Sequence, residues 1–214
     1  MLVVRKFVFN LFYENTYVIW DEETKECVIV DPGCSNSSEE EKLYAYVNEY
    51  ELFVKYLINT HCHIDHIFGN NFVKEEYHPK FLIPKEDLEL LEKAETQGAA
   101  FGLHVKQQPV PDDYLSEEKN IFLGNSEMKF LYTPGHTPGE FSIYFSKEEF
   151  CLTGDVLFKN SIGRTDLWNA DYDTLLESIQ TKLMKLPDDT LIYPGHGESS
   201  KIGIEKMMNP FLLL

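Results

Sequence analysis

Positive charge is scarce in this chain. Its 214 residues include 19 lysines and arginines against 36 aspartates and glutamates, so the formal net charge is −17 at pH 7. A field of that sign repels phosphate backbones and works against the binding of nucleic acid. We therefore expect no nucleic-acid partner.

Signals for disulfides and for membrane insertion are also lacking. No apolar run approaches the 18 residues of a membrane-spanning helix, and the apolar stretch at residues 3–20 is interrupted by polar residues and followed by no cleavage site. The four cysteines form no C-x-x-C pair, and a chain of this length needs no disulfide to stabilise its core. They are expected to be free thiols in a reducing compartment: Cys27, Cys34, Cys62 and Cys151. The sequence thus predicts one cytoplasmic domain over residues 1–214, with no membrane partner.

Strand and helix patterns alternate along the whole chain. Runs rich in β-branched and aromatic residues predict strands at residues 3–9, 17–20, 26–30, 54–58, 81–83, 129–133, 141–145, 150–153 and 191–193. Apolar residues at helical spacing predict a helix capped at Ser38, and further helices at residues 84–100, 172–186 and 199–208. This mixture predicts an α/β or α+β fold with two covered sheets.

One short segment is unusually rich in potential metal ligands. His61, His63, Asp65 and His66 follow the strand expected at residues 54–58. Neutral imidazole and carboxylate are the donors that zinc, iron and manganese bind. A polar loop with surface histidines is the alternative interpretation of this segment taken alone.

Three later turns each add one potential ligand. His136 lies in a turn rich in glycine and proline at residues 133–139, Asp155 follows the strand expected at residues 150–153, and His196 follows the last expected strand. Taken singly, each has an ordinary explanation as a turn residue or a helix cap. Together they place donors at several strand ends, where an α/β protein can assemble a rigid site.

The order of these motifs resembles the metallo-β-lactamase superfamily over essentially the whole chain. The pattern H-x-H-x-D-H is followed by a Gly-His turn, by Gly-Asp and by a second Gly-His, and preceded by Asp31-Pro32-Gly33 and by residues 14–17. Residues 161–166 resemble the single-domain, glyoxalase II-like hydrolases of that superfamily. The resemblance implies an αβ/βα four-layer sandwich, with two mixed β-sheets face to face and helices on the outer faces.

The resemblance also implies a set of ligands for two divalent metal ions. His61, His63 and His136 would bind the first ion, Asp65, His66 and His196 the second, and Asp155 would bridge the two. Zinc is the expected metal, with iron and manganese as alternatives, because mixed histidine and aspartate sites accept all three. Asp65 and Asp155 are the two carboxylates expected to serve catalysis.

A hydrolytic mechanism follows from such a ligand set. Two cations about 3.5–4 Å apart can share a hydroxide that attacks a carbonyl carbon, so no protein nucleophile is needed. The chain contains no Gly-x-Ser-x-Gly segment that would supply one. Thioesters suit this chemistry because a thiolate leaving group, whose conjugate acid has a pKa near 8–9, needs little protonation. We expect a small-molecule thioester such as hydroxyacylglutathione as substrate.

Two further residues have open roles. Asp31 could accept a hydrogen bond from a metal-binding histidine, or it could simply cap its turn. Arg164 could hold a substrate carboxylate, or it could pair with Asp166 or Asp155 and fix its loop. Cys62, between two proposed ligands, is expected to point away from the metals and pack in the core.

The substrate is the least determined part of the prediction. Full-length glyoxalase II carries a C-terminal helical segment that helps to bind glutathione, and this sequence ends shortly after His196. A persulfide dioxygenase with one iron is the alternative activity, because such enzymes share this type of domain. A non-catalytic binding domain is disfavoured by the complete ligand set. Metal content separates the first two activities, and the sequence carries no signal about oligomeric state.

Overall fold

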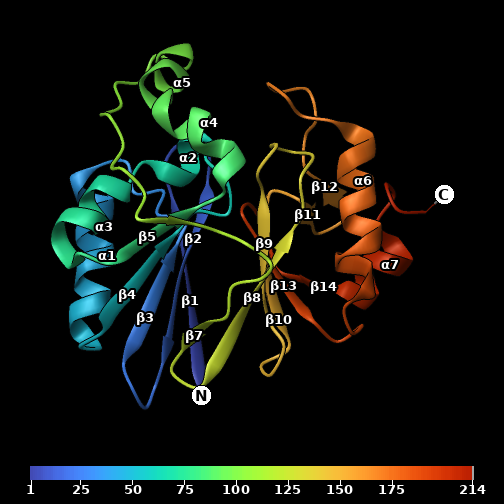
Figure 1. Ribbon diagram of the computed structural model, residues 1–214, viewed down its shortest axis with the longest axis horizontal. Helices are drawn as coiled ribbons and strands as arrows, with labels where there is room; N and C mark the ends of the chain where they lie inside the picture. Colours follow the sequence, from blue (N-terminus) through green and yellow to red (C-terminus); the bar gives the residue numbers. More distant parts are fainter. Residues whose placement is uncertain (214) are drawn as a thin grey trace. The chain divides into compact units, whose positions relative to one another are not determined.

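The computed structural model describes residues 1–213 and divides into two compact units. The first comprises residues 1–114 and 123–125, and the second comprises residues 115–122 and the chain from Ser126 onward. Each unit contains one six-stranded sheet with helices packed on it (Figure 1).

The sheet of the first unit is mixed. Its strands follow in sequence order: β1 (Leu2–Phe9), β2 (Glu14–Asp21), β3 (Glu26–Val30), β4 (Phe53–Ile58), β5 (Lys80–Ile83) and β6 (Asp113–Tyr114). The first three strands pair antiparallel, whereas β3 to β6 pair parallel. Because β3 and β4 are parallel neighbours, the loops that follow them leave the same edge of the sheet.

Short helices connect the parallel strands of the first unit. They are α1 (Ser37–Glu49), α2 (Ile64–Ile67), α3 (Asn70–Tyr77), the 3₁₀ turn η1 (Lys85–Asp87), α4 (Leu88–Glu92) and α5 (Ala94–Ala100). Figure 1 shows α1 and α3 on one face of this sheet. Leu43 and Val47 of α1 are buried in the same apolar cluster as Ile29 of β3 and Leu57 of β4. Burial of this face holds the helix against the sheet.

Two helix predictions in this unit are wrong in detail. The N-cap of α1 is Asn36 rather than Ser38, because the Asn36 side chain accepts the backbone N–H groups of Ser38 and Glu39. The single helix expected at residues 84–100 is divided into η1, α4 and α5. The break falls at Lys93, which has non-helical backbone angles at the end of α4.

The sheet of the second unit is also mixed, in the order β14-β13-β10-β9-β8-β7. Its strands are β7 (Ile121–Leu123), β8 (Ser126–Tyr132), β9 (Phe141–Phe145), β10 (Phe150–Gly154), β13 (Leu191–Pro194) and β14 (Ser200–Lys201). The pairs β8–β9 and β9–β10 are antiparallel, and β10–β13 is parallel. A separate ribbon pairs β11 (Leu157–Phe158) with β12 (Ser161–Ile162).

Helices α6 (Tyr172–Thr181) and α7 (Ile202–Met208) belong to the second unit, together with the 3₁₀ turn η2 (Leu183–Lys185). Leu175 and Ile179 of α6 pack in one buried cluster with Cys151 of β10 and Ile192 of β13. The last helix starts later than residue 199, because Ser200 and Lys201 instead pair with β13. The predicted fold class, α/β with two mixed sheets and helices, is confirmed. No helix within residues 1–213 is long and apolar enough to cross a membrane.

Candidate functional site

The candidate ligands of the first unit lie where two parallel strands end. Strand β4 ends at Ile58 and leads through Thr60 to His61, while β3 ends at Val30 and leads to Asp31. The Asp31 backbone N–H donates to the carbonyl of Ile58, which ties the two loops together. Asp31 has a φ of 50°, in the left-handed region that aspartate tolerates better than most residues. The turn therefore aims its carboxylate at the neighbouring loop.

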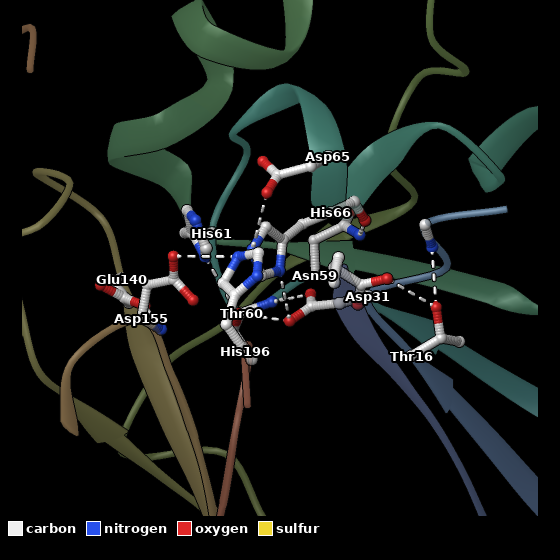
Figure 2. Close-up of polar contacts among 12 residues, drawn as sticks. Thr16, Asp31, Asn59, Thr60, His61, Asp65, His66, Glu140, Asp155 and His196 are labelled. Atoms are coloured by element: carbon white, nitrogen blue, oxygen red, sulfur yellow. Dashed lines mark hydrogen bonds and ion pairs between the residues drawn. The ribbon is translucent and has the colours of Figure 1, made fainter. Parts of the chain in front are cut away.

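The Asp31 carboxylate fixes the orientation of Thr60 and, through it, of His61. Its Oδ1 accepts the Thr60 backbone N–H at 2.7 Å, and its Oδ2 accepts the Thr60 hydroxyl at 2.6 Å (Figure 2). The Thr60 Oγ1 also lies 3.1 Å from Nδ1 of His61. Since the hydroxyl proton is directed to Asp31, His61 Nδ1 must be the donor in that second contact. The neutral His61 ring then has its lone pair on Nε2, where a metal can bind.

His66 is held by the same carboxylate. Its Nδ1 lies 3.2 Å from Asp31 Oδ2, and both side chains are almost completely buried. The other ring nitrogen of His66, Nε2, lies 3.8 Å from Asp65 Oδ2. The His61 and His66 rings are 4.1 Å apart between centroids, and the His61 and His63 rings are 4.9 Å apart. In the first unit, Thr60 and Asp31 thus lie against His61 and His66, and His63 and Asp65 lie beside these two histidines.

The second unit gathers the other three predicted ligands. His136 lies between β8 and β9, Asp155 follows β10, and His196 follows β13. Asp155 Oδ2 is 3.6 Å from His136 Nε2 and 3.5 Å from His196 Nε2. Two ligands of one tetrahedral ion lie about 3.4 Å apart when each metal–ligand bond is about 2.0–2.1 Å long. These separations therefore suit donors that share an ion better than donors that hydrogen-bond to each other.

The tautomer of His136 is set by a backbone group. Its Nδ1 lies 2.8 Å from the carbonyl oxygen of Arg164, which can only accept, so Nδ1 carries the proton and Nε2 the lone pair. The Arg164 side chain is exposed and makes a two-pronged ion pair with Asp166, at 2.7 and 2.8 Å. The hydrogen bonds from Arg164 lower the pKa of Asp166 to about 2. Of the two roles considered for Arg164, the structure shows the loop-fixing pair with Asp166.

Glu140 is a residue that the sequence analysis missed. Its side chain is completely buried, and its Oε1 accepts the backbone N–H of Asp155 at 2.6 Å (Figure 2). The contact fixes the peptide that carries the proposed bridging carboxylate. The one signal for it was a glutamate at the start of an otherwise apolar strand, since charged residues are seldom buried without a partner.

The four cysteines are free, as predicted, and Cys62 packs in the core as expected. All four are buried, and the core around Cys62 is the apolar cluster of the first unit. Burial raises the pKa of the Cys62 thiol well above its ordinary value. None of the groups of possible metal ligands within residues 1–213 includes Cys62.

Two mixed sheets with imidazole and carboxylate donors at their strand ends define a metal-binding α/β protein. A model of the metallo-β-lactamase superfamily matches residues 10–196, so the chain belongs to that superfamily of metal-dependent hydrolases, as its motifs predicted. The hydroxyacylglutathione hydrolase GloC of Haemophilus influenzae is 39% identical over 203 residues, which cover 94% of this chain and 93% of the relative.

Solved structures give the same family and add information on metals. The BLEG-1 B3 metallo-β-lactamase aligns with a TM-score of 0.91 and 33% identity, over 99% of this chain and 100% of its own. The protein TTHA1623, crystallised in a di-iron-bound form, aligns with a TM-score of 0.87 and 32% identity, over 98% of this chain and 100% of its own. The neutral imidazoles and carboxylates described above fit a divalent metal, and this donor chemistry accepts iron as well as zinc.

Proposed function

We propose that this protein hydrolyses thioesters by means of two divalent cations, with zinc as the first candidate metal. In this proposal His61, His63 and His136 hold the first cation, Asp65, His66 and His196 hold the second, and Asp155 binds both. The observation that carries the proposal is the position of Asp155 Oδ2, close to Nε2 of both His136 and His196. In this proposal His136 binds one cation and His196 the other, so a carboxylate close to both imidazoles is well placed to bind both cations.

The chain's own residues would prepare these donors. Bound divalent cations supply Lewis-acid activation of water and of a carbonyl oxygen. Thr60 and the Arg164 carbonyl would keep protons on Nδ1 of His61 and His136, so that each Nε2 remains free to bind a metal. Asp31 Oδ2 lies 3.2 Å from Nδ1 of His66 and would favour a proton there as well. Asp65 is only partly buried, with 14% of its side chain exposed, and would accept a hydrogen bond from water entering the site.

The likeness to GloC supports thioesters as the substrate class. It extends over nearly the full length of both chains, so it includes every proposed ligand position rather than one motif. Thioester hydrolysis also makes a modest demand on the protein, because the departing thiolate needs little protonation near neutral pH.

The test is reconstitution of metal-free protein followed by two assays. We expect thiol release from S-lactoylglutathione after addition of zinc, iron or manganese, and no release from metal-free protein. His196→Ala should abolish release, whereas His104→Ala, which removes an exposed histidine outside the motifs, should leave it unchanged. Oxygen consumption with glutathione persulfide, together with no thiol release from S-lactoylglutathione, would instead establish the dioxygenase alternative. Turnover of a β-lactam alone would also contradict thioester hydrolysis.

A further inference from the structure

The residue between the first two proposed ligands is held from both sides by one distant segment. Cys62 separates His61 from His63, and its backbone N–H donates to Asp87 Oδ2 at 3.1 Å. Its carbonyl oxygen accepts Nε2 of Gln97 at 3.1 Å. Asp87 closes η1 and Gln97 lies in α5, so both holding side chains come from residues 85–100.

These two contacts act on different peptide groups. The Cys62 N–H belongs to the peptide that joins it to His61, and the Cys62 carbonyl belongs to the peptide that joins it to His63. Each peptide group is planar, so fixing both planes fixes the backbone angles of Cys62. The directions of the His61 and His63 side chains then follow from those angles. The buried Cys62 thiol side chain, packed in the apolar cluster, is a third anchor at the same residue.

The Gln97 side chain also reaches back across the break between α4 and α5. Gln97 Nε2 also donates to the carbonyl of Leu90 in α4 at 2.7 Å, so one amide group joins α4, α5 and the ligand segment. Asp87 is completely buried and Gln97 is half-buried. A local departure from helical regularity next to a ligand segment is expected where function constrains the backbone.

We propose that Asp87 and Gln97 are positioning residues that set the metal affinity of His61 and His63. The inference rests on the proposed metal binding by these histidines. Neither Asp87 nor Gln97 binds the metal in this account. They hold Cys62 so that the two rings are presented together before the ion arrives, which lowers the ordering cost of binding.

The test compares metal affinity with the stability of the metal-free protein. Gln97→Met keeps the length of the side chain but cannot donate, and we expect it to weaken zinc binding about tenfold in competition with a chromophoric chelator. Gln108→Met is the matched control, because Gln108 Nε2 donates to the backbone carbonyl of Lys106, away from the ligand segment. Asp87→Asn keeps an acceptor oxygen for Cys62 N–H and should bind zinc within about twofold of the native protein.

The outcomes are distinguishable. A lower melting temperature of metal-free Gln97→Met, with unchanged zinc affinity, would assign Gln97 a purely structural role and overturn the inference. If Gln97→Met does not fold, Gln97→Asn, which is one methylene too short to reach Cys62, replaces it. Failure of both to fold would equally make Gln97 a folding residue and overturn the inference. Absence of metal binding by the native protein would instead contradict the proposed function.

Discussion

Replacing Asp31 by asparagine should weaken metal binding by two proposed ligands, His61 and His66, without changing the shape of the side chain at position 31. Asparagine tolerates the left-handed backbone of position 31 as well as aspartate does, so the substitution adds no backbone strain. Its carbonyl oxygen can still accept the Thr60 N–H that Oδ1 accepts now. Its amide NH₂, however, replaces Oδ2, which now accepts from the Thr60 hydroxyl and faces His66 Nδ1.

A donor at that position would reverse the hydrogen-bond chain through Thr60 to His61, and it would replace the acceptor oxygen that lies 3.2 Å from His66 Nδ1. His66 Nδ1 would have to accept the amide proton, so the ring proton moves to Nε2. The Thr60 hydroxyl proton, no longer held by residue 31, would turn to His61 Nδ1 at 3.1 Å and move the proton of that ring to Nε2 as well. Both nitrogens that should bind metal then carry hydrogen. Loss of one such orienting partner costs about 10–100-fold in metal affinity. We expect about 100-fold for Asp31→Asn, or about 2.7 kcal/mol.

The assay is zinc competition against a chelator of known affinity, with circular dichroism to establish folding. Thr60→Val removes the chain to His61 but leaves His66 with Asp31, so it should lose about tenfold. Asp21→Asn is the matched control, because Asp21 is buried and its Oδ1 accepts the backbone N–H of Glu23 in a turn of the same unit. A folded Asp31→Asn protein that binds zinc as tightly as Asp21→Asn would refute the reasoning.

Four further predictions follow from the same account. Asp155→Ala should lose most hydrolytic activity and at least one metal per chain by elemental analysis, and retention of both metals with normal turnover would show that Asp155 is no bridge. A chelator should lower the melting temperature, because metal binding adds to the stability of the folded state, and an unchanged melting curve after verified metal removal would count against it. Glu26→Gln should cost about 0.5–1 kcal/mol near neutral pH and progressively less in acid, because hydrogen bonds from the Gly124 N–H and from Lys55 lower the Glu26 pKa below its ordinary value of 4.5. The stabilisation is present above pH 4.5 and is lost as the pH falls through the lowered pKa of the folded state, so a pH-independent difference in calorimetry would refute this. Steady-state kinetics should show turnover of a short acyl thioester as well as of S-lactoylglutathione, because the proposed reaction takes place at the thioester carbonyl, and turnover of neither substrate would contradict the proposal.

The strands and the family were predictable from the sequence because their signals are local. Strand β3 has the bounds that its β-branched run predicts, and β9 likewise coincides with its apolar run. The donors in H-x-H-x-D-H lie within a few residues of one another, so backbone geometry alone keeps them close. The order of the motifs also predicted the superfamily, and the match over residues 10–196 confirms that prediction.

The supporting contacts were not predictable, because they depend on residues that are distant in the chain. Glu140 reaches the Asp155 N–H only through the antiparallel register that places Ile143 opposite Leu152. Arg164 supports His136 through its backbone carbonyl, and a carbonyl has no residue signature.

The helix ends were predicted wrongly for a related reason. No proline or glycine marks the break at Lys93, and the hydrogen bonds of Gln97 to the carbonyls of Cys62 and Leu90 have no local sequence signal. At the start of α1, Asn36 and Ser38 are both good caps by type. Asn36 is the residue with extended backbone angles, and Glu39 accepts the Ser35 N–H beside it. Both residue types suit a cap, and the structure adds a long-range contact at this end of the helix, because Glu39 also accepts the backbone N–H of Asn10.

The most direct test of the central claim is a metal titration of thioester hydrolysis. Metal-free protein is mixed with increasing equivalents of zinc, and the initial rate of thiol release from S-lactoylglutathione is measured at each point. A dinuclear hydrolase predicts that the rate reaches its plateau at about two equivalents per chain. A plateau at one equivalent, or no thiol release at any metal content, would contradict it.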